Sequence, residues 1–318
     1  MKRTFLALVA ALAAAAGTVQ AQQYPVKPVR IVAPFAPGGG TDFIARIVAQ
    51  KLTEGTKQQF IVENRPGAGG TVGVEIAVKS SADGYTLLLI SGSYAVNPSL
   101  YKLKFDPVND ITPIIQVSQG PFVIVTHPSL PVKTVKELVA LAKAKPDSIN
   151  YATSGQGSIT HLATELFLTT TGVKITHIPY KGTGPAVTDT IAGHTQLLFG
   201  SAAGVVPHIR SGKMRAIAVS TPKRVAALPN VPTVLESGIK YEVTLWHGLI
   251  GPKGLPRPVV ELANGLINEA LKGKDMDERL AIDGVSSAGG TPDQFLALIK
   301  TDIERWRKVI AQAGVKAE

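Results

Sequence analysis

The sequence predicts an α/β fold, with mostly parallel sheets covered by helices on both faces. The first reason is that short apolar runs rich in β-branched residues alternate with amphipathic stretches at helical spacing. The second reason is that clusters of Gly, Ser and Pro separate these runs, as expected of the loops between elements. Strand–helix alternation of this kind is typical of parallel strands, because the connecting helices cover both faces of the sheet.

The N-terminal residues have the layout of a secretory signal peptide over 1–21. Lys2 and Arg3 precede an apolar stretch at 5–16, and a small-residue cleavage site ends at Ala21. A membrane-spanning helix needs about 20 apolar residues, so this stretch is too short, although a retained N-terminal anchor is the alternative. We therefore expect a periplasmic protein. The chain has no cysteine, and the residues after Ala21 suffice for two domains held by their cores alone.

The net charge of +10 is concentrated in the middle of the chain. Residues 123–245 hold 12 Lys and Arg against 6 Asp and Glu. A basic segment attracts nucleic acid, anionic lipid or small anions. This one has no run of cations and little aromatic interleaving, so we expect no nucleic-acid partner and favour small anions.

In the first part of the chain the apolar pattern predicts strands that lead into glycine- or serine-rich loops. Val29–Ala33 is predicted as a buried strand, and 43–52 as a helix with one apolar face. The further elements expected here are strands at 60–62, 85–90 and 122–126 and a helix at 72–78.

The middle and the end of the chain continue the same alternation. Thr134 and Glu137 form a capping box that opens a helix at Val135–Ala144. A later helix is expected to end at Thr171, with Gly172 as its C-terminal cap. The remaining expected elements are strands at 149–153, 174–178, 196–199 and Arg215–Val219 and two or three C-terminal helices, including 258–271 and a helix from 291 to about 313.

Glycine- or serine-rich loops recur after the predicted strands. Such a loop lies at the amino end of the following helix, where unpaired N–H groups and the helix dipole favour an anion. Each loop taken alone is a plain turn, but together they predict a cleft lined by amide donors and hydroxyls. The loops are 36–42, 64–70, 91–93, 154–158, 180–184 and 200–204.

Enzyme signatures fail on the same residues. The sequence has no phosphate-loop Lys-Ser/Thr and no nucleophile elbow, and its two near-matches to the dinucleotide fingerprint lack the third glycine. Its six histidines show no metal-ligand spacing, so we expect no catalytic residues, no metal and no cofactor. The roles of three residues stay open. Asp42 either contacts the ligand or is an acidic residue in the first turn of a helix, and His161 either reaches the cleft or is a hydrogen-bonded residue of a helix. Lys181 either neutralises an anion or is an exposed lysine in a turn.

The same loops also carry a family resemblance that spans nearly the whole mature chain. Its strings are Pro37-Gly-Gly-Gly-Thr-Asp42, Asn64-Arg-Pro-Gly-Ala-Gly-Gly70, Asp83-Gly-Tyr85, His127-Pro-Ser-Leu-Pro131, Tyr151-Ala-Thr-Ser-Gly-Gln-Gly-Ser158, Pro179-Tyr-Lys-Gly182, 224–232 and 246–252. Each string is weak, but their order and spacing are specific. The chain resembles the periplasmic solute-binding receptors of the tripartite tricarboxylate transporters, also called Bug (Bordetella uptake gene) receptors.

The resemblance implies a periplasmic-binding-protein type II-like fold, in which two α/β domains joined by a two-strand hinge close on a ligand like a Venus flytrap. It places domain 1 at 24–122 plus 246–318 and domain 2 at 123–245, with crossings near 122–126 and 241–247. It implies a monomer that captures a small organic carboxylate or dicarboxylate for the membrane permease subunits of a tripartite tricarboxylate-type transporter. A periplasmic ligand sensor that signals to a membrane ectodomain is the alternative.

Carried over position by position, the resemblance nominates ligand-binding residues in both domains. They are Phe35, Ala36, Gly38, Gly39, Thr41, Asp42, Gly69 and Ser93 in domain 1, and Ser154, Gly155, Gly157, Ser158, Tyr180, Lys181 and Ser201 in domain 2. Donor-rich loops in both domains favour a ligand with two polar ends. A phosphate would more often recruit arginine forks, which these loops of domain 2 lack. Phe35, Tyr180 and Trp246 leave an aromatic or longer aliphatic carboxylate as the alternative.

Overall fold

The computed structural model describes residues 24–313, so the predicted signal peptide lies outside the described residues. The strands are β1 (Val29–Ala33), β2 (Phe60–Asn64), β3 (Thr86–Ser91), β4 (Ile111–Thr126), β5 (Asn150–Thr153), β6 (Thr176–Pro179), β7 (Leu197–Ser201), β8 (Arg215–Val219), β9 (Thr244–Pro252) and β10 (Ser286–Ser287). The α-helices are α2 (Gly40–Thr56), α3 (Thr71–Val78), α4 (Ser93–Leu100), α5 (Val135–Ala144), α6 (Ile159–Thr171), α7 (Thr183–Ile191), α8 (Ala202–Arg210), α9 (Arg257–Lys272), α10 (Lys274–Ile282) and α11 (Pro292–Ala313).

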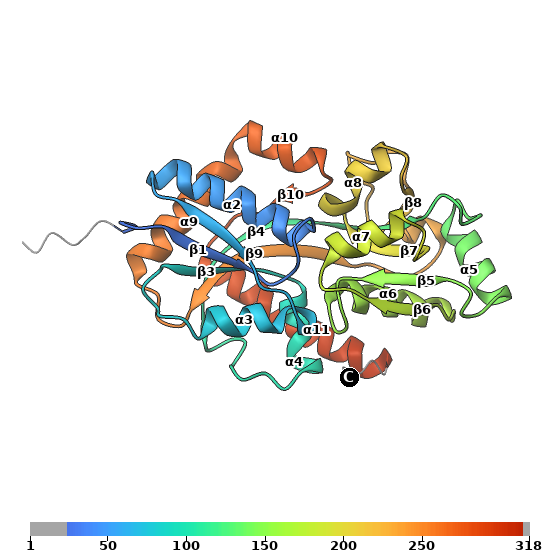
Figure 1. The fold of residues 1–318 in the computed structure, drawn as a ribbon, viewed down its shortest axis with the longest axis horizontal. Helices are drawn as coiled ribbons and strands as arrows, with labels where there is room; N and C mark the ends of the chain where they lie inside the picture. Colours follow the sequence, from blue (N-terminus) through green and yellow to red (C-terminus); the bar gives the residue numbers. More distant parts are fainter. Residues whose placement is uncertain (1–23, 314–318) are drawn as a thin grey trace, which may run out of the picture.

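The strands form a continuous sheet in the order β2-β1-β3-β9-β4-β7-β5-β6, with β8 and β10 also paired to β4. The chain divides along this sheet into two lobes (Figure 1). Lobe 1 contains β1–β3, β10, α2–α4 and α9–α11, and lobe 2 contains β5–β8 and α5–α8. The long strands β4 and β9 connect the lobes.

Lobe 1 is built on the parallel strands β2, β1 and β3. Val29, Ile31 and Ala33 pack with α2, α9 and α10, whereas Val32 packs on the other face with α3, α4 and α11. Strands β1 and β3 are therefore buried on both faces, which is why they appear in the sequence as continuous apolar runs, whereas the edge strand β2 is partly exposed.

Lobe 2 repeats this arrangement with the parallel strands β6, β5 and β7. In the last part of β4, Phe122 and Ile124 pack with α5 and α6, while Val123 and Val125 pack with α7 and α8. Each lobe thus has its own three-layer core of helices, sheet and helices.

The sheet is mixed rather than mostly parallel, which corrects the sequence-based expectation. The pairs β4–β9, β3–β9, β4–β7 and β4–β8 are antiparallel. The physical reason is that the chain enters lobe 2 along β4 and returns to lobe 1 along β9, so the two connecting strands run in opposite directions. Both predicted crossings overlap these strands.

Several predicted helix ends are confirmed. The hydroxyl oxygen of Thr134 accepts a hydrogen bond of 3.1 Å from the Glu137 N–H at the start of α5. Gly172 ends α6 in the left-handed conformation with φ 66°, a conformation that glycine adopts without the steric cost of a Cβ atom. No helix among residues 24–313 is long and apolar enough to cross a membrane.

The sequence did not predict α4 or the first eleven residues of β4. Pro98 lies inside α4, and Pro113 and Pro121 lie inside β4. Proline usually marks the end of a helix or a strand. In β4 the irregular register between Pro113 and Ile115 accommodates the first of these prolines.

Candidate functional site

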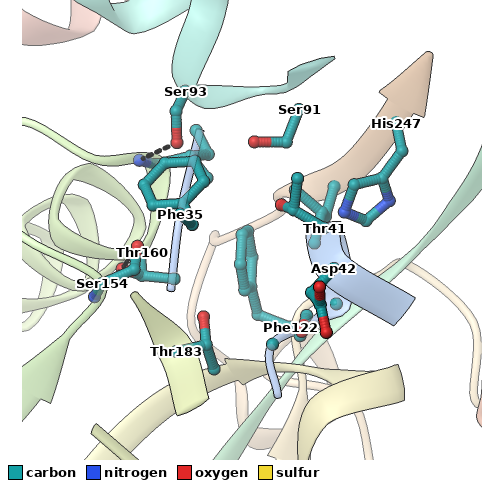
Figure 2. Close-up of a pocket in the computed structure, with 15 residues that line it drawn as sticks. Phe35, Thr41, Asp42, Ser91, Ser93, Phe122, Ser154, Thr160, Thr183 and His247 are labelled. Atoms are coloured by element: carbon teal, nitrogen blue, oxygen red, sulfur yellow. Dashed lines mark hydrogen bonds between the residues drawn. The ribbon is translucent and has the colours of Figure 1, made fainter. Parts of the chain in front are cut away.

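A cavity lies between the lobes, above the paired strands β4 and β9 (Figure 2). Its lining residues come from both lobes: Phe35, Gly39, Gly40, Thr41, Asp42, Ser91, Ser93, Phe122, Ser154, Ile159, Thr160, Thr183, Ser201, Leu245 and His247. Its volume of ≈ 20 Å³ has room for about one water molecule. In this arrangement the lobes are therefore closed.

Five helices begin at this cavity. Their first residues or caps line it, namely Gly40 of α2, Ser93 of α4, Ile159 of α6, Thr183 of α7 and Ser201 before α8. Only α6 has a side-chain cap, while α2, α4, α7 and α8 have none. The N–H groups in the first turn of a helix have no partner within the helix. The cavity is thus bordered by uncapped amides and by the positive ends of helix dipoles, and no Lys or Arg lines it.

Asp42 holds the first glycine loop in place. Its Oδ2 accepts hydrogen bonds from the Gly38 N–H at 3.1 Å and from Arg46 Nε at 3.0 Å, and its Oδ1 accepts one from Asn64 Nδ2 at 3.0 Å. Burial raises the pKa of Asp42, but the bonds from Arg46, Asn64 and Gly38 outweigh it and hold the pKa below its ordinary value. Both carboxylate oxygens are therefore occupied within lobe 1, and a ligand contact by Asp42 stays a prediction.

The Phe35 ring is positioned by the second glycine loop. Asn64 Nδ2 donates to the Phe35 carbonyl oxygen at 2.9 Å. A Cβ atom at Gly70 would stand 3.0 Å from the tip of the Phe35 ring, and Gly70 has φ 100°, which disfavours any other residue. Gly70 thus leaves space for the buried Phe35 side chain at the cavity wall.

The loop that opens α6 is fixed by its own polar side chains. Thr160 Oγ1 accepts from the Ser154 N–H at 2.8 Å, and Ser158 Oγ accepts from the His161 N–H at 3.4 Å. His161 Nδ1 accepts from the Gly157 N–H at 3.2 Å, and its ring stacks on His177 with centroids 4.2 Å apart. Burial lowers the pKa of His161 to about 4. His161 therefore supports the loop and does not line the cavity.

The glycine loops of the two lobes contact one another directly. The Ala36 N–H donates to the Lys181 carbonyl oxygen at 2.9 Å, and the Ile159 N–H donates to Ser93 Oγ at 3.0 Å. Tyr101 Oη donates to the carbonyl oxygen of residue 156 at 2.6 Å. These hydrogen bonds join lobe 1 to lobe 2 and stabilise the closed arrangement.

A second, larger cavity of ≈ 250 Å³ adjoins the first and shares Phe35 and Ser154 with it. Tyr180, which also lines it, donates a hydrogen bond of 2.6 Å to Asp189, and burial, reinforced by this carboxylate, raises its pKa to about 12. Its lining consists of Phe35, Gly67, Ala68, Gly69, Gly70, Tyr101, Ser154, Gly155, Gln156, Pro179, Tyr180 and Lys181.

The structure divides the predicted site residues into three groups. Phe35, Gly39, Thr41, Asp42, Ser93, Ser154 and Ser201 line the first cavity, and Gly69, Gly155, Tyr180 and Lys181 line the second. Ala36, Gly38, Gly157 and Ser158 line neither, and their bonds lie within or between the loops. Trp246, considered as a flank for a longer ligand, also lines neither, because its Nε1 donates to Asp302 at 2.8 Å and its ring packs on Phe295.

Eight lining residues were not predicted: Gly40, Ser91, Phe122, Ile159, Thr160, Thr183, Leu245 and His247. Gly40, Ser91 and Thr183 lie in the loops 36–42, 91–93 and 180–184, which were predicted to line a cleft. Phe122, Leu245 and His247 lie in the two predicted crossings, which form the floor of the cavity. The signal that would have found these three is the crossing itself, since both connecting strands pass beneath any ligand held between the lobes.

Among the described residues, no cluster of three or more His, Asp or Glu side chains is arranged to hold a metal ion.

The fold and the loops match known proteins. Residues 44–315 match the family described as tripartite tricarboxylate transporter family receptor. The protein BugT of Bordetella pertussis is 40% identical over 310 residues, which cover 96% of this chain and 95% of BugT. The solved structure of the periplasmic binding protein BugD has a TM-score of 0.90 at 35% identity, covering 93% of this chain and 100% of BugD.

Two similar solved structures hold a dicarboxylate. Rpa4515 of R. palustris with adipate has a TM-score of 0.89 at 34% identity, covering 92% of this chain and 99% of Rpa4515. MatC of Rhodopseudomonas palustris with bound malate has a TM-score of 0.85 at 29% identity, covering 90% of this chain and 100% of MatC. The chain belongs to the tripartite tricarboxylate transporter receptor family, whose members are periplasmic solute-binding receptors, as the sequence resemblance predicted.

Proposed function

We propose that this receptor captures a small dicarboxylate in the periplasm and delivers it to the membrane permease of a tripartite tricarboxylate-type transporter. The observation that carries the proposal is the meeting of four uncapped helix N-termini, from both lobes, around one cavity without Lys or Arg. Adipate and malate in two relatives support a dicarboxylate as the ligand class.

Amides and hydroxyls on both sides of the cavity suit a ligand with a carboxylate at each end. Lobe 1 offers the first-turn amides of α2 and α4, and lobe 2 offers those of α7 and α8. Each charge-assisted hydrogen bond contributes about 1.5–3 kcal/mol. Lys181 stands at the second cavity, where it can neutralise the outer end of a longer diacid.

Ligand entry requires that the lobes separate. A volume of ≈ 20 Å³ is too small for a diacid, and bonds between the glycine loops close the entrance. We infer that lobes 1 and 2 are the predicted domains, at 24–122 plus 246–318 and at 123–245. In this proposal β4 and β9 form the hinge, and rotation about them opens and closes the cavity around the ligand.

The proposal includes a cleavable signal peptide at 1–21, a monomeric periplasmic receptor and a permease as its partner. The sequence of the N-terminal residues and the family of periplasmic receptors support the compartment. Loss of uptake of the bound acid by cells that lack the receptor, and its recovery with the full-length chain, test the transport role.

A thermal-shift and calorimetric screen of diacids, with their monoesters, phosphates and sugars, tests the ligand class. A ligand at 100 times its Kd raises the free energy of unfolding by about 2.7 kcal/mol. We expect a diacid to give such a shift and its monoester to bind at least about tenfold more weakly, because esterification removes the charge-assisted hydrogen bonds to one carboxylate. Equal binding of acid and monoester would refute the two-ended site, and preference for a phosphate or a sugar would refute the carboxylate assignment.

A further inference from the structure

Two polar atoms at the cavity have no hydrogen-bond partner within the protein. Among the described residues, three buried side-chain atoms lack a hydrogen-bond partner, namely Ser201 Oγ, His247 Nε2 and Thr126 Oγ1. Buried polar groups are nearly always hydrogen-bonded, since an unpaired one costs folding free energy. Ser201 and His247 both line the first cavity, whereas Thr126 does not. Two unpaired atoms at one cavity indicate a partner that the chain itself does not supply.

Ser201 of lobe 2 and His247 of the connecting strand β9 approach the same residue. A Cβ atom at Gly40 would stand 2.5 Å from Ser201 Oγ and 3.7 Å from His247 Cε1. Both side chains therefore lie against the first residue of α2, where the absence of a side chain leaves room for them. Figure 2 shows the His247 ring beside Thr41, projecting from β9. Ser201 and His247 are therefore neighbours at the cavity wall, and we infer that one small ligand group inside the cavity can contact both.

The hydrogen-bonding role of His247 depends on which nitrogen carries the proton. Its Nδ1 lies 3.2 Å from the hydroxyl oxygen of Ser118, which is fully buried on β4. Burial lowers the pKa of His247 to about 3, so the ring is neutral at pH 7 and has a single N–H. If Ser118 donates to Nδ1, the cavity-facing Nε2 is a donor, and if Nδ1 donates to Ser118, Nε2 is an acceptor.

We propose that His247 and Ser201 bind a hydroxyl group of the ligand, so that the receptor selects a hydroxylated dicarboxylate over the plain one. A hydroxyl satisfies both residues in either tautomer. It accepts from Nε2–H and donates to Ser201 Oγ, or it donates to Nε2 and accepts from the Ser201 hydroxyl. A carboxylate oxygen only accepts and therefore fits one tautomer alone. This inference rests on the proposed function, in which the uncapped helix N-termini bind the carboxylates.

The preference for a hydroxylated diacid should be strong, because the hydroxyl stabilises the complex and its absence destabilises it. A ligand with the hydroxyl gains its hydrogen bonds, whereas a ligand without it leaves two buried polar atoms unpaired. Sites that bind a substrate hydroxyl reject the analogue lacking it more strongly than apolar pockets reject an extra group. We expect at least about a tenfold difference in Kd from one such hydrogen-bonded group. Since Ser201 and His247 are fixed in position, one enantiomer is preferred.

Calorimetry with succinate and the two enantiomers of malate, which differ from succinate only by a hydroxyl, tests the inference. We expect one malate to bind at least about tenfold more tightly than succinate. Ser201→Ala and His247→Phe should reduce this ratio to within about threefold, while His247→Gln retains part of it, since an amide supplies both a donor and an acceptor. If longer acids bind better, adipate and its 2- and 3-hydroxy derivatives replace this set with the same expectation.

The matched control is Thr126→Val, which removes the third unpaired hydroxyl away from the cavity and should leave the ratio unchanged. Ser201→Ala should not lower the melting temperature of the unliganded protein, because it removes an unpaired group. Equal affinities for the plain acid and every hydroxylated one, or a ratio that survives in both Ser201→Ala and His247→Phe, would overturn the inference and leave the carboxylate receptor intact. Failure of every diacid to bind would instead refute the proposed function.

Discussion

The backbone N–H of Ala36 donates a 2.9 Å hydrogen bond to the carbonyl oxygen of Lys181. Both residues were nominated as ligand contacts, but their main chains bind one another across the boundary between the lobes. Since the bond joins two main-chain groups, no truncation of a side chain removes it. The glycines beside it, which let the two loops approach so closely, are the positions at which closure can be tested.

Gly184→Ala should prevent closure. A Cβ atom at Gly184, the second residue of α7, would stand 2.0 Å from the Pro37 carbonyl oxygen in the opposite lobe. We expect the affinity for a diacid to fall at least about tenfold, while the unliganded protein gains up to about 1 kcal/mol, because alanine is favoured over glycine in a helix. Small-angle scattering should show that the variant fails to become more compact with ligand. Gly265→Ala, with open space around its Cβ, is the control.

Gly39→Val should weaken ligand binding with little change in the unliganded melting temperature. Gly39 has φ −99° and ψ 173°, which valine adopts readily, so the loop itself is not strained. In the closed arrangement its Cβ would stand 3.1 Å from Thr183 Cβ, and the branched atoms would fill the cavity. Calorimetry should give an affinity lower by a factor of about 100, with Gly39→Ala intermediate. Normal binding by the valine variant would show that this loop only makes a turn.

Arg46→Met should reduce anion affinity through Asp42. Arg46 Nη2 lies 3.0 Å from Asp42 Oδ1, and the loss of Arg46 leaves an unbalanced carboxylate charge at the cavity wall. Succinate should bind more weakly, on the order of fivefold at low salt, and the effect should shrink as salt rises. Aspartate, whose amino group can meet Asp42, should lose less. Arg65→Met, which breaks an ion pair with Glu63, is the control, and equal losses in both variants would contradict the role of Asp42.

Stability should fall as the pH drops below about 6.5, partly because two histidines are buried. Burial lowers the pKa of His161 to about 4 and that of His247 to about 3. An unfolded histidine binds a proton near pH 6.5, so on acidification the unfolded state takes up protons first and gains population. Each residue should cost about 1 kcal/mol between pH 7 and pH 5.5.

Urea unfolding at the two pH values measures this loss. His247→Gln should remove its share of the pH dependence. An identical pH dependence in the wild type and His247→Gln would show that His247 does not titrate differently in the folded protein.

Local patterns predicted most elements because their signals are local. The strand Val29–Ala33 and the helix Val135–Ala144 were predicted with the boundaries that they have. A continuous run of apolar residues identifies the strand. The hydrogen bond from the Glu137 N–H to the Thr134 side chain fixes the start of the helix. The antiparallel pairing of β4 with β9 was not predictable in the same way, because the register between Ile111 and Pro252 joins residues far apart in the chain.

The site was predictable where backbone chemistry decides it and not where tertiary packing does. Glycine loops before helices marked the amides at Gly39 and Ser93, and both residues line the cavity. His247 carries no local sign of its role. Alternation along β9 turns its ring toward the cavity and the neighbouring Trp246 away from it. Which of these two side chains points into the cavity depends on which face of β9 meets lobe 2. The sequence around residue 247 does not by itself determine this.

The cation-free lining of the cavity has a consequence for the kinetics of release. The four uncapped helix N-termini are divided equally between the lobes, so each lobe of an open receptor keeps two of them, and no Lys or Arg lines the first cavity to retain the anion. We therefore expect the residence time of the ligand to be set by the time that the proposed hinge takes to open. In the proposed transport role, a permease that separates the two lobes would therefore receive the acid without needing a stronger positive charge of its own to compete for it.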